Sequence, residues 1–367
     1  MIGSNMRLFQ GLLRKRNIFS FVLWLVPASV IGQTAPVARP LSPLIVIAHR
    51  GASGLRPEHT LASYTLAIEQ GADFIEPDLV LTKDDVFVAR HENDITGTTD
   101  VAAHPEFASR KTTKTIDGEK HTGWFTEDFT LAELKTLRAK ERLPQLRPGN
   151  AAYDGQFEVP TLAEIIALAK KHKVGIYPET KHPSYFASIG HPMEALLVAQ
   201  LKAAGWSKAS DPVFIQSFEV NNLKALHKMT GLRLIQLMGA TGAPVDSLND
   251  GAPPSYAAMI TPVGLKAVAA YAYGIGPDKA MIKNGDAPPT SLVADAHAAG
   301  LRVHPYTFRA ENTFLPPSLR TGTDLAAHGR LAEEITRYAD LGIDGFFTDF
   351  AYIGVEARDR RRQMDEK

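Results

Sequence analysis

Titratable side chains stand at the ends of several short apolar runs in this sequence, where burial normally excludes charge. The run 45–48 ends in His49 and Arg50. A second run ends in Glu76-Pro77-Asp78, and a third ends in Glu179-Thr180-Lys181. Charged groups in such places form either solvated turns or a site that handles charge.

The carboxylates among these residues have the spacing of a cation site. Glu76 and Asp78 are two apart on a strand-like run, so their side chains point to the same face. Pro77 cannot donate to a ladder, which indicates the end of a strand. Adjacent carboxylates repel each other unless a proton or a cation lies between them. Glu179 brings a third carboxylate, and oxygen ligands without cysteine favour Ca²⁺ or Mg²⁺.

The alternative is a structural network in which each carboxylate pairs with Arg50, Lys181 or another base. Glu76 and Asp78 alone support the metal site and the structural network equally. Three carboxylates at two strand ends favour the metal, and we expect one divalent cation, with Ca²⁺ ahead of Mg²⁺.

Two histidines are candidates for acid and base. Imidazole titrates near pH 6.5, so small shifts let His49 and His91 accept and donate protons at neutral pH. Arg50 and Lys181 add fixed positive charge, which suits a phosphoryl group. His304 stands at a strand end without a clear partner, and the nine other histidines are interpreted as structural. These residue types together predict metal-assisted phosphoester chemistry.

The elements that must position these residues alternate between strand and helix. Eight apolar runs predict strands, and most are followed by helix-like stretches, several of which end in glycine. The runs lie at 44–49, 72–80, 174–180, 212–218, 232–238, 272–277, 301–307 and 344–350. Helices are expected at 61–71, 161–172, 193–205, 291–300 and 331–342. The pattern predicts an α/β fold, a (β/α)₈ TIM barrel with its site at the carboxyl ends of the strands.

An open doubly wound sheet is the competing fold, and no G-x-G-x-x-G follows the first strand to favour its dinucleotide-binding form. The region 94–158 is polar and too long for an ordinary loop. We expect it to be a small insertion after the second strand that lies over the barrel mouth. A second rim loop is expected at 239–256.

Composition narrows the class of protein. The 367 residues are 44% hydrophobic and 22% charged, with a formal net charge of zero. This is an ordinary globular composition, and it offers no basic field for nucleic acid. The absence of cysteine excludes disulfides, thiolate metal sites and cysteine nucleophiles.

The N-terminus has the pattern of an export signal. Arg7 and the basic run 14–16 precede an apolar stretch and then small residues, as in a secretory signal peptide. Cleavage is expected between Ala28 and Ala35. The alternative is a membrane anchor, for which the stretch is short. We therefore expect a signal peptide and the start of a linker at 1–35, the barrel at 36–360 and a charged tail at 361–367. The mature protein is expected in the periplasm, without stable membrane insertion.

The motifs resemble those of the glycerophosphodiester phosphodiesterase family. The stretches "HRGASGLRPEHT", "EPDLVLTKDD", "RHEN", "IYPETKHP", "YGIGPDK", "VHPYTFR" and "GFFTDF" follow the family's order from about residue 44 to 355. The PEHT variant, the polar insertion and "VHPYT" resemble its exported, periplasmic branch.

The resemblance implies a barrel that hydrolyses glycerophosphodiesters, such as glycerophosphocholine and glycerophosphoethanolamine, to sn-glycerol 3-phosphate and an alcohol. It makes His49 the general base and His91 the general acid, and it makes Glu76, Asp78 and Glu179 the metal ligands. It implies phosphate contacts for Arg50 and Lys181 and a site carboxylate at Glu58. Aromatic walls of the substrate slot, or ordinary core residues, are expected at Phe218, Tyr306 and Phe350. The glycines of the first motif are expected to bring the backbone close to the substrate.

One departure from the family pattern concerns Glu92. The family commonly has His-Asp at the second histidine, whereas here His91 precedes a glutamate. The extra methylene shifts the hydrogen-bond geometry at the imidazole. Two other functions compete with the hydrolase: a sphingomyelinase D-like phospholipase on the same barrel, and an exported glycerophosphoryl-binding protein without turnover.

Overall fold

The computed structural model describes residues 44–247 and 254–365. The expected signal peptide at 1–35 and the middle of the expected rim loop at 239–256 lie outside these residues. Within them, no helix combines the length and the apolar character needed to span a bilayer.

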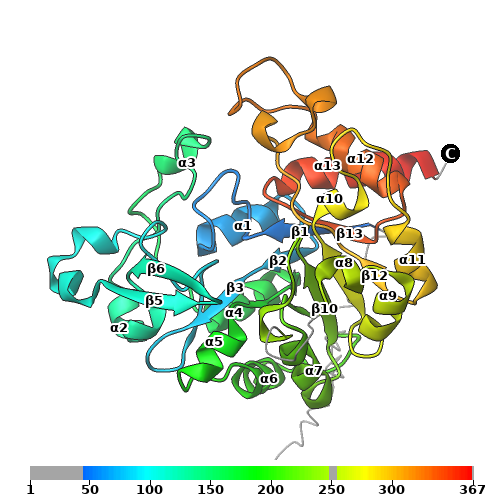
Figure 1. Cartoon of the computed structure of the whole chain (residues 1–367). Coiled ribbons are helices and arrows are strands. Elements are labelled where there is room, and N and C mark those ends of the chain that lie inside the picture. Colours follow the sequence, from blue (N-terminus) through cyan, green and yellow to red (C-terminus); the bar gives the residue numbers. More distant parts are fainter. Residues whose placement is uncertain (1–43, 248–253, 366–367) are drawn as a thin grey trace, which may run out of the picture. The chain divides into compact units, whose positions relative to one another are not determined.

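Eight strand positions of the described residues close into the predicted barrel, whose strands and surrounding helices can be followed in Figure 1. Neighbouring strands pair in parallel, and β13 pairs with β1. Between β12 and β13 the backbone N–H groups of Asp344 and Phe347 donate to Val303 and Pro305, at 2.9 and 3.0 Å. In order, the strands are β1 (Ile45–His49), β2 and β3 (Phe74–Glu76 and Asp78–Leu81), β7 and β8 (Gly175–Ile176 and Glu179–Thr180), β9 (Phe214–Ser217), β10 (Arg233–Met238), β11 (Gly274–Pro277), β12 (Arg302–Val303) and β13 (Gly345–Thr348).

Two prolines divide the second and third strand positions into two short strands each. Pro77 separates β2 from β3, and Pro178 separates β7 from β8, because proline has no N–H to donate to the ladder. Their carbonyls still accept, from Glu179 N and Gln216 N respectively, both at 2.9 Å. The barrel wall therefore continues through both interruptions.

Helices surround the strands. The expected helices are confirmed as α1 (Leu61–Glu69), α4 (Leu162–His172), α6 (Glu194–Ala203), α11 (Leu292–Ala298) and α12 (Leu331–Asp340). Thr60 caps α1 and Thr161 caps α4, in the second case with a capping box to Glu164. The structure adds α5 (Pro183–Ser188), α7 (Val220–Met229), α8 (Tyr256–Met259), α9 (Pro262–Val268), α10 (Lys279–Ile282) and α13 (Ala351–Asp365), with 3₁₀ turns η4 (Val245–Ser247), η5 (Asn312–Phe314) and η6 (Pro317–Leu319). The first residues of the expected charged tail at 361–367 continue α13 as far as Asp365.

The barrel interior explains why charge follows the apolar runs. Alternate side chains of a strand point inward, and the lower layer is apolar. It consists of Ile45, Ile47, Phe74, Tyr177, Phe214, Ile235 and Phe347. The next inward positions are His49 after Ile47, Glu76 after Phe74, Glu179 after Tyr177, Gln216 after Phe214 and Asp349 after Phe347. On each of these strands, the inward-facing residue two positions after the last core residue therefore belongs to the polar layer.

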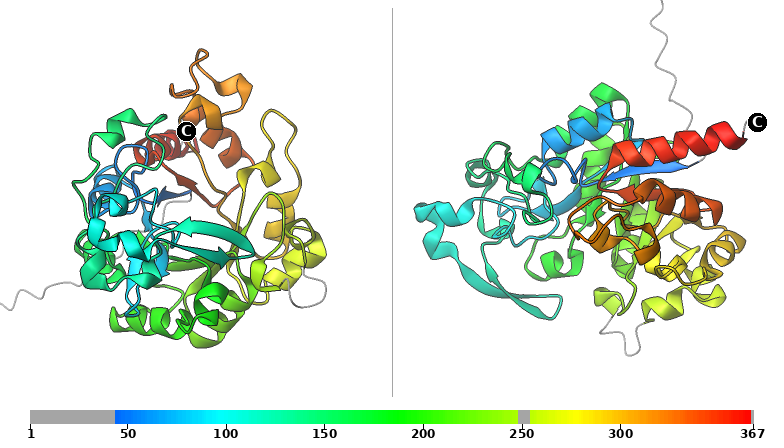
Figure 2. Two further views of the ribbon diagram at one scale, coloured as in Figure 1. Left: turned by 60° about the vertical axis from the view of Figure 1, so that its left-hand side comes forward. Right: turned by 90° about the horizontal axis from the view of Figure 1, so that it is seen from above.

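The insertion at 94–158 follows β4 (Phe87–Ala89), which pairs antiparallel with β3. It contains η1 (Val101–Ala103), η2 (Pro105–Arg110), the hairpin β5 (Thr112–Ile116) and β6 (Glu119–Gly123), η3 (Thr126–Asp128), α2 (Leu131–Leu134) and α3 (Pro148–Ala151). The hairpin crosses in front of the barrel in the left view of Figure 2. The insertion also has an apolar side, because Phe107, Trp124 and Phe129 are buried in the main core.

Candidate active site

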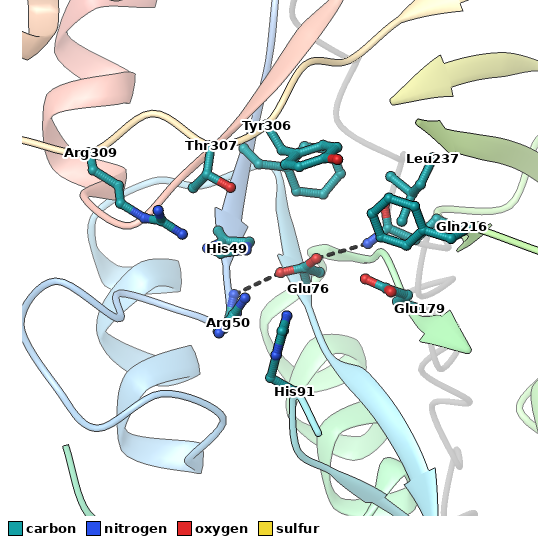
Figure 3. Close-up of a pocket in the computed structure, with 12 residues that line it drawn as sticks. His49, Arg50, Glu76, His91, Glu179, Gln216, Leu237, Tyr306, Thr307 and Arg309 are labelled. Carbon is teal, nitrogen blue, oxygen red and sulfur yellow. Dashed lines mark hydrogen bonds between the residues drawn. The ribbon is translucent and has the colours of Figure 1, made fainter. Parts of the chain in front are cut away.

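A cavity of about 120 Å³ opens at the carboxyl ends of the barrel strands (Figure 3). Its polar wall includes His49, Arg50, Glu76, His91, Glu179 and Gln216. Its apolar wall includes Phe218, Leu237, Tyr306 and Phe347. The structure therefore brings both candidate histidines and two of the candidate metal ligands to one cavity.

The three expected metal ligands form a cluster. One oxygen of each of Glu76, Asp78 and Glu179 lies within 4.8 Å of the others, and all three residues are buried. Burial and the neighbouring carboxylates raise the pKa of Glu76 well above its ordinary value, and burial and Asp78 raise that of Glu179 to about 8. A cation held between these oxygens would oppose both upward pKa shifts, because its charge favours the ionised carboxylates.

The ion pairs of the alternative interpretation are present as well. Lys181 Nζ lies 3.1 Å from Glu179 Oε1, and Arg50 Nε lies 3.5 Å from Asp78 Oδ2. They do not satisfy the cluster, because Asp78 Oδ1 is buried without a hydrogen-bond partner in the described part of the chain. A buried carboxylate oxygen without a donor is an acceptor suited to a hard cation.

His49 is oriented by Asp349. Its Nδ1 lies 2.6 Å from Asp349 Oδ1, and the other oxygen, Oδ2, accepts from Arg147 at 2.5 Å and Arg309 at 3.0 Å. Burial alone would raise the pKa of Asp349, but these two guanidinium groups hold it well below its usual range. An ionised carboxylate only accepts, so His49 donates Nδ1–H. Burial and Arg50 lower the pKa of His49 to about 4, and its neutral ring therefore keeps Nε2 free to take a proton.

Two carboxylates, Glu76 and Glu58, hold Arg50 in place. Its backbone N–H donates to Glu76 Oε2 at 2.9 Å, and its guanidinium contacts Glu58 at 3.1 Å. Arg142, from the insertion, donates to the same Glu58 at 2.9 Å. Glu58 was expected as a site carboxylate, and it supports Arg50 rather than forming part of the cavity wall.

The glycines of the first motif lie where neighbouring residues leave no room for a side chain. Gly51 has a φ of +85°, and a Cβ there would lie 2.4 Å from the hydroxyl of Ser63 on α1. A Cβ on Gly54 would lie 2.5 Å from the ring of Phe350. Both positions therefore require glycine for packing, and the expected approach of this backbone to a substrate stays a prediction.

In Figure 3, His91 lies below Arg50 and Glu76, whereas His49 lies above Arg50. The Nδ1 atom of His91 is 2.7 Å from Glu92 Oε1. Burial, Arg50 and Lys181 lower the pKa of His91, while the hydrogen bond to Glu92 opposes them. A phosphodiester anion between these cations would add a charge that favours the imidazolium. Glu92 thus orients His91 despite its longer side chain.

The expected aromatic residues divide into two groups. Phe218 and Tyr306 line the cavity, with ring centroids 6.0 Å apart at right angles. Phe350 does not line the substrate slot and is instead a core residue. It is fully buried against Gly54 and His328, outside the cavity wall. Because Asp349 points inward, the next side chain turns toward the helices.

Several residues beside the site were not assigned from the sequence. His59 donates to or accepts from Asp78 Oδ2 at 2.9 Å and the Tyr64 hydroxyl at 2.8 Å. Gln216 donates to Glu76 Oε1 at 2.8 Å. Gln216 and Asp349 could have been found, because both stand two residues after an inward-facing phenylalanine. Arg147 comes from the insertion, and nothing in its local sequence indicates its contact with Asp349.

Comparison with known proteins agrees with this geometry. The model of the Glycerophosphoryl diester phosphodiesterase family matches residues 49–352. The glycerophosphodiester phosphodiesterase GDPD6 of Arabidopsis thaliana is 38% identical over 322 residues, which cover 83% of each chain. The glycerophosphodiester phosphodiesterase of Haemophilus influenzae is 32% identical, over 85% of this chain and 89% of its own.

Solved structures show the same fold. An Oleispira antarctica phosphodiesterase, solved in complex with its product sn-glycerol-3-phosphate, superposes with a TM-score of 0.58 at 22% identity. The match covers 86% of this chain and 96% of that one.

The barrel and its polar layer define a phosphoric diester hydrolase of the TIM-barrel class. The chain belongs to the glycerophosphoryl diester phosphodiesterase family, and it is a glycerophosphodiester phosphodiesterase.

Proposed function

We propose that this enzyme hydrolyses glycerophosphodiesters, among them glycerophosphocholine and glycerophosphoethanolamine, to sn-glycerol 3-phosphate and an alcohol. In this proposal it uses a divalent cation and two histidines. One observation carries it: two histidines, each with Nδ1 within 2.7 Å of a carboxylate oxygen, line the same cavity as Glu76 and Glu179. A pair oriented in this way is suited to take one proton and give another.

Glu76, Asp78 and Glu179 would hold the cation. Their oxygens converge within 4.8 Å, and the buried Asp78 Oδ1 has no donor in the described residues. An all-oxygen set of three carboxylates fits Ca²⁺ or Mg²⁺, and we favour Ca²⁺ because its coordination is more adaptable. When bound, such a cation supplies positive charge that stabilises the phosphoryl oxygens.

The chain's own residues perform the proton transfers. Arg50 donates to a phosphoryl oxygen, with Lys181 adding positive charge beside Glu179. His49 Nε2 removes a proton from the attacking oxygen while Asp349 holds the ring. His91 protonates the departing alcohol, and Phe218 and Tyr306 bound the space beside it. The attacking oxygen is that of water or of the adjacent glycerol hydroxyl. A hydroxyl attack would produce a cyclic phosphate that single-turnover trapping can detect.

Release of glycerol 3-phosphate from glycerophosphocholine tests this function. The purified enzyme should release it, EDTA should stop the release, and Ca²⁺ should restore it at least as well as Mg²⁺. Persistence of full activity in EDTA would contradict the cation. Failure to turn over any glycerophosphodiester would favour the binding-protein interpretation.

The polar hairpin argues against a lipid substrate. Exposed residues of β5 and β6 are threonine, lysine, glutamate and similar polar types. A phospholipase working at a membrane needs apolar or aromatic side chains on its rim. Assay with sphingomyelin and lysophospholipid vesicles should therefore give much less turnover than glycerophosphocholine does.

We also propose that the chain is exported to the periplasm. The basic residues, apolar stretch and small residues before Ala35 support this, and the absence of cysteine excludes lipid attachment through a cysteine. N-terminal sequencing of the mature protein should show cleavage between Ala28 and Ala35. A mature protein that retains its first residues would contradict the export signal.

A further inference from the structure

Glu92 connects His91 to a second histidine. Its Oε1 lies 2.7 Å from His91 Nδ1, and its Oε2 lies 2.8 Å from His182 Nε2. The other ring nitrogen of His182, Nδ1, lies 2.5 Å from Asp117 Oδ2. The four side chains therefore form one continuous chain of alternating imidazoles and carboxylates that ends at the cavity.

The protonation states of these four side chains follow from their hydrogen bonds. Burial would lower the pKa of His182, but its hydrogen bonds to Asp117 and Glu92 raise it to about 9. His182 is therefore an imidazolium at neutral pH, and it donates from both nitrogens. Glu92 then accepts from His182 on Oε2, while its Oε1 faces His91 Nδ1 at 2.7 Å. The negative charge beside Nδ1 favours an N–H there, which leaves Nε2 of the general acid to carry the proton for the leaving alcohol.

This row of four side chains extends from the barrel into the insertion. His182 immediately follows Lys181 and precedes α5, whereas Asp117 is in the two-residue turn of the β5–β6 hairpin. Both residues have left-handed backbones, with φ of 49° and 51°. A second link joins the same elements, since Glu127 Oε1 accepts from Lys114 of the hairpin at 2.9 Å and from Tyr185 of α5 at 2.6 Å. The hairpin is thus attached beside His91 at two points.

We propose that Glu92 and His182 are positioning residues for His91, and that Asp117 lets the insertion hairpin hold them in place. This rests on the proposed function, in which His91 protonates the leaving alcohol. The insertion supports the other histidine as well, through Arg147 and Asp349. Both His49 and His91 then depend on the insertion at 94–158, which contributes no strand to the barrel.

The test uses the leaving group to distinguish positioning from general damage. Choline is a poor leaving alcohol that needs its proton, whereas p-nitrophenolate leaves without one. The variants are His182→Asn and Asp117→Asn, because asparagine tolerates a left-handed backbone. His191→Asn is the matched control: His191 Nδ1 also bonds an aspartate, Asp85 at 2.6 Å, but at an exposed position away from the cavity.

Both variants should lower kcat for glycerophosphocholine by about 10- to 100-fold, with KM changed less than about 3-fold. For glycerophospho-p-nitrophenol their kcat should fall less than about 3-fold, and His191→Asn should match wild type on both substrates. Circular dichroism and thermal melting establish that each variant is folded. Asp117→Asn, in a partly exposed turn, keeps the test open if His182→Asn does not fold.

Equal losses on both substrates, or wild-type kcat for glycerophosphocholine in Asp117→Asn and His182→Asn, would overturn the positioning role alone. A wild-type enzyme that hydrolyses neither substrate would overturn the proposed function and this inference with it. The two failures are therefore distinguishable.

Discussion

Asp349 has two roles, one in orienting His49 and one in ion pairing, and two different assays of one variant measure them. It accepts from His49 Nδ1 at 2.6 Å, and it is also the counter-ion of Arg147 and Arg309. Asp349→Asn removes the charge with little change in volume. An asparagine can keep one acceptor for His49, but only by turning its NH₂ group toward the two guanidinium groups. Either orientation of the amide leaves one of these contacts unfavourable.

The expected losses follow from these contacts. A hydrogen bond to a charged partner is worth about 1.5 to 3 kcal/mol, and each 1.4 kcal/mol is tenfold, so kcat/KM should fall by about 10- to 150-fold. Breaking a buried ion pair costs about 3 to 5 kcal/mol of stability. Arg147 keeps Glu311 at 2.6 Å, so the free energy of unfolding should fall by about 3 kcal/mol, the low end of that range.

The assays are kcat/KM for glycerol 3-phosphate release and thermal melting of the same preparations. Asp344→Asn is the control, because Asp344 also bonds a histidine and an arginine, His297 at 2.8 Å and Arg302 at 2.7 Å, at the opposite end of the same strand. It should keep wild-type kcat/KM. If Asp349→Asn is as active as Asp344→Asn, the orientation of His49 by Asp349 is refuted.

Two further predictions concern the carboxylate cluster and Phe350. Without a cation, the raised pKa of Glu179, about 8 against an ordinary 4.5, makes the folded chain retain a proton that the unfolded chain loses. Stability then falls as pH rises between these values, so the increase in Tm on adding Ca²⁺ should be larger at pH 8 than at pH 5. It should be about 5 °C at a hundred times Kd, and Glu179→Gln should abolish most of it. Phe350→Leu should cost about 1 to 2 kcal/mol of stability without changing KM, whereas Phe218→Leu should raise KM.

Differential scanning fluorimetry across pH checks the first of these, and a Ca²⁺ effect independent of pH would contradict it. Denaturant unfolding and steady-state kinetics check the second. A raised KM in Phe350→Leu would return that ring to the substrate slot.

The period of the strands made much of the site predictable. Because inward positions recur every second residue, Glu76 and Asp78 had to share a face, and the strand ends had to meet at one rim. His49 and Glu179 follow from the same rule, and so do the barrel and its main helices. The spacing of residues along each strand therefore determines which polar side chains face the cavity.

The supporting contacts were not predictable in this way. The strand period indicates that Asp349 faces inward, but not that it pairs with His49, 300 residues away. Nor does it indicate that Arg147 reaches Asp349 from an insertion that is polar in sequence. The sequence indicates only a structural role for His59, yet this side chain bonds the metal-ligand candidate Asp78. Phe350 was misassigned because a strand-end aromatic can face the cavity or the helices, and only the closed barrel decides which. Contacts between distant segments have no periodic signal to indicate them.

The central claim is that His49 and His91 together perform the proton transfers of glycerophosphodiester hydrolysis. Its most direct test is glycerol 3-phosphate release from glycerophosphocholine by the wild type, His49→Ala and His91→Ala, with the exposed His227→Ala as control. Each site variant should lose at least about 100-fold in kcat while His227→Ala stays at the wild-type rate. Activity near that of wild type in either site variant would contradict the two-histidine mechanism.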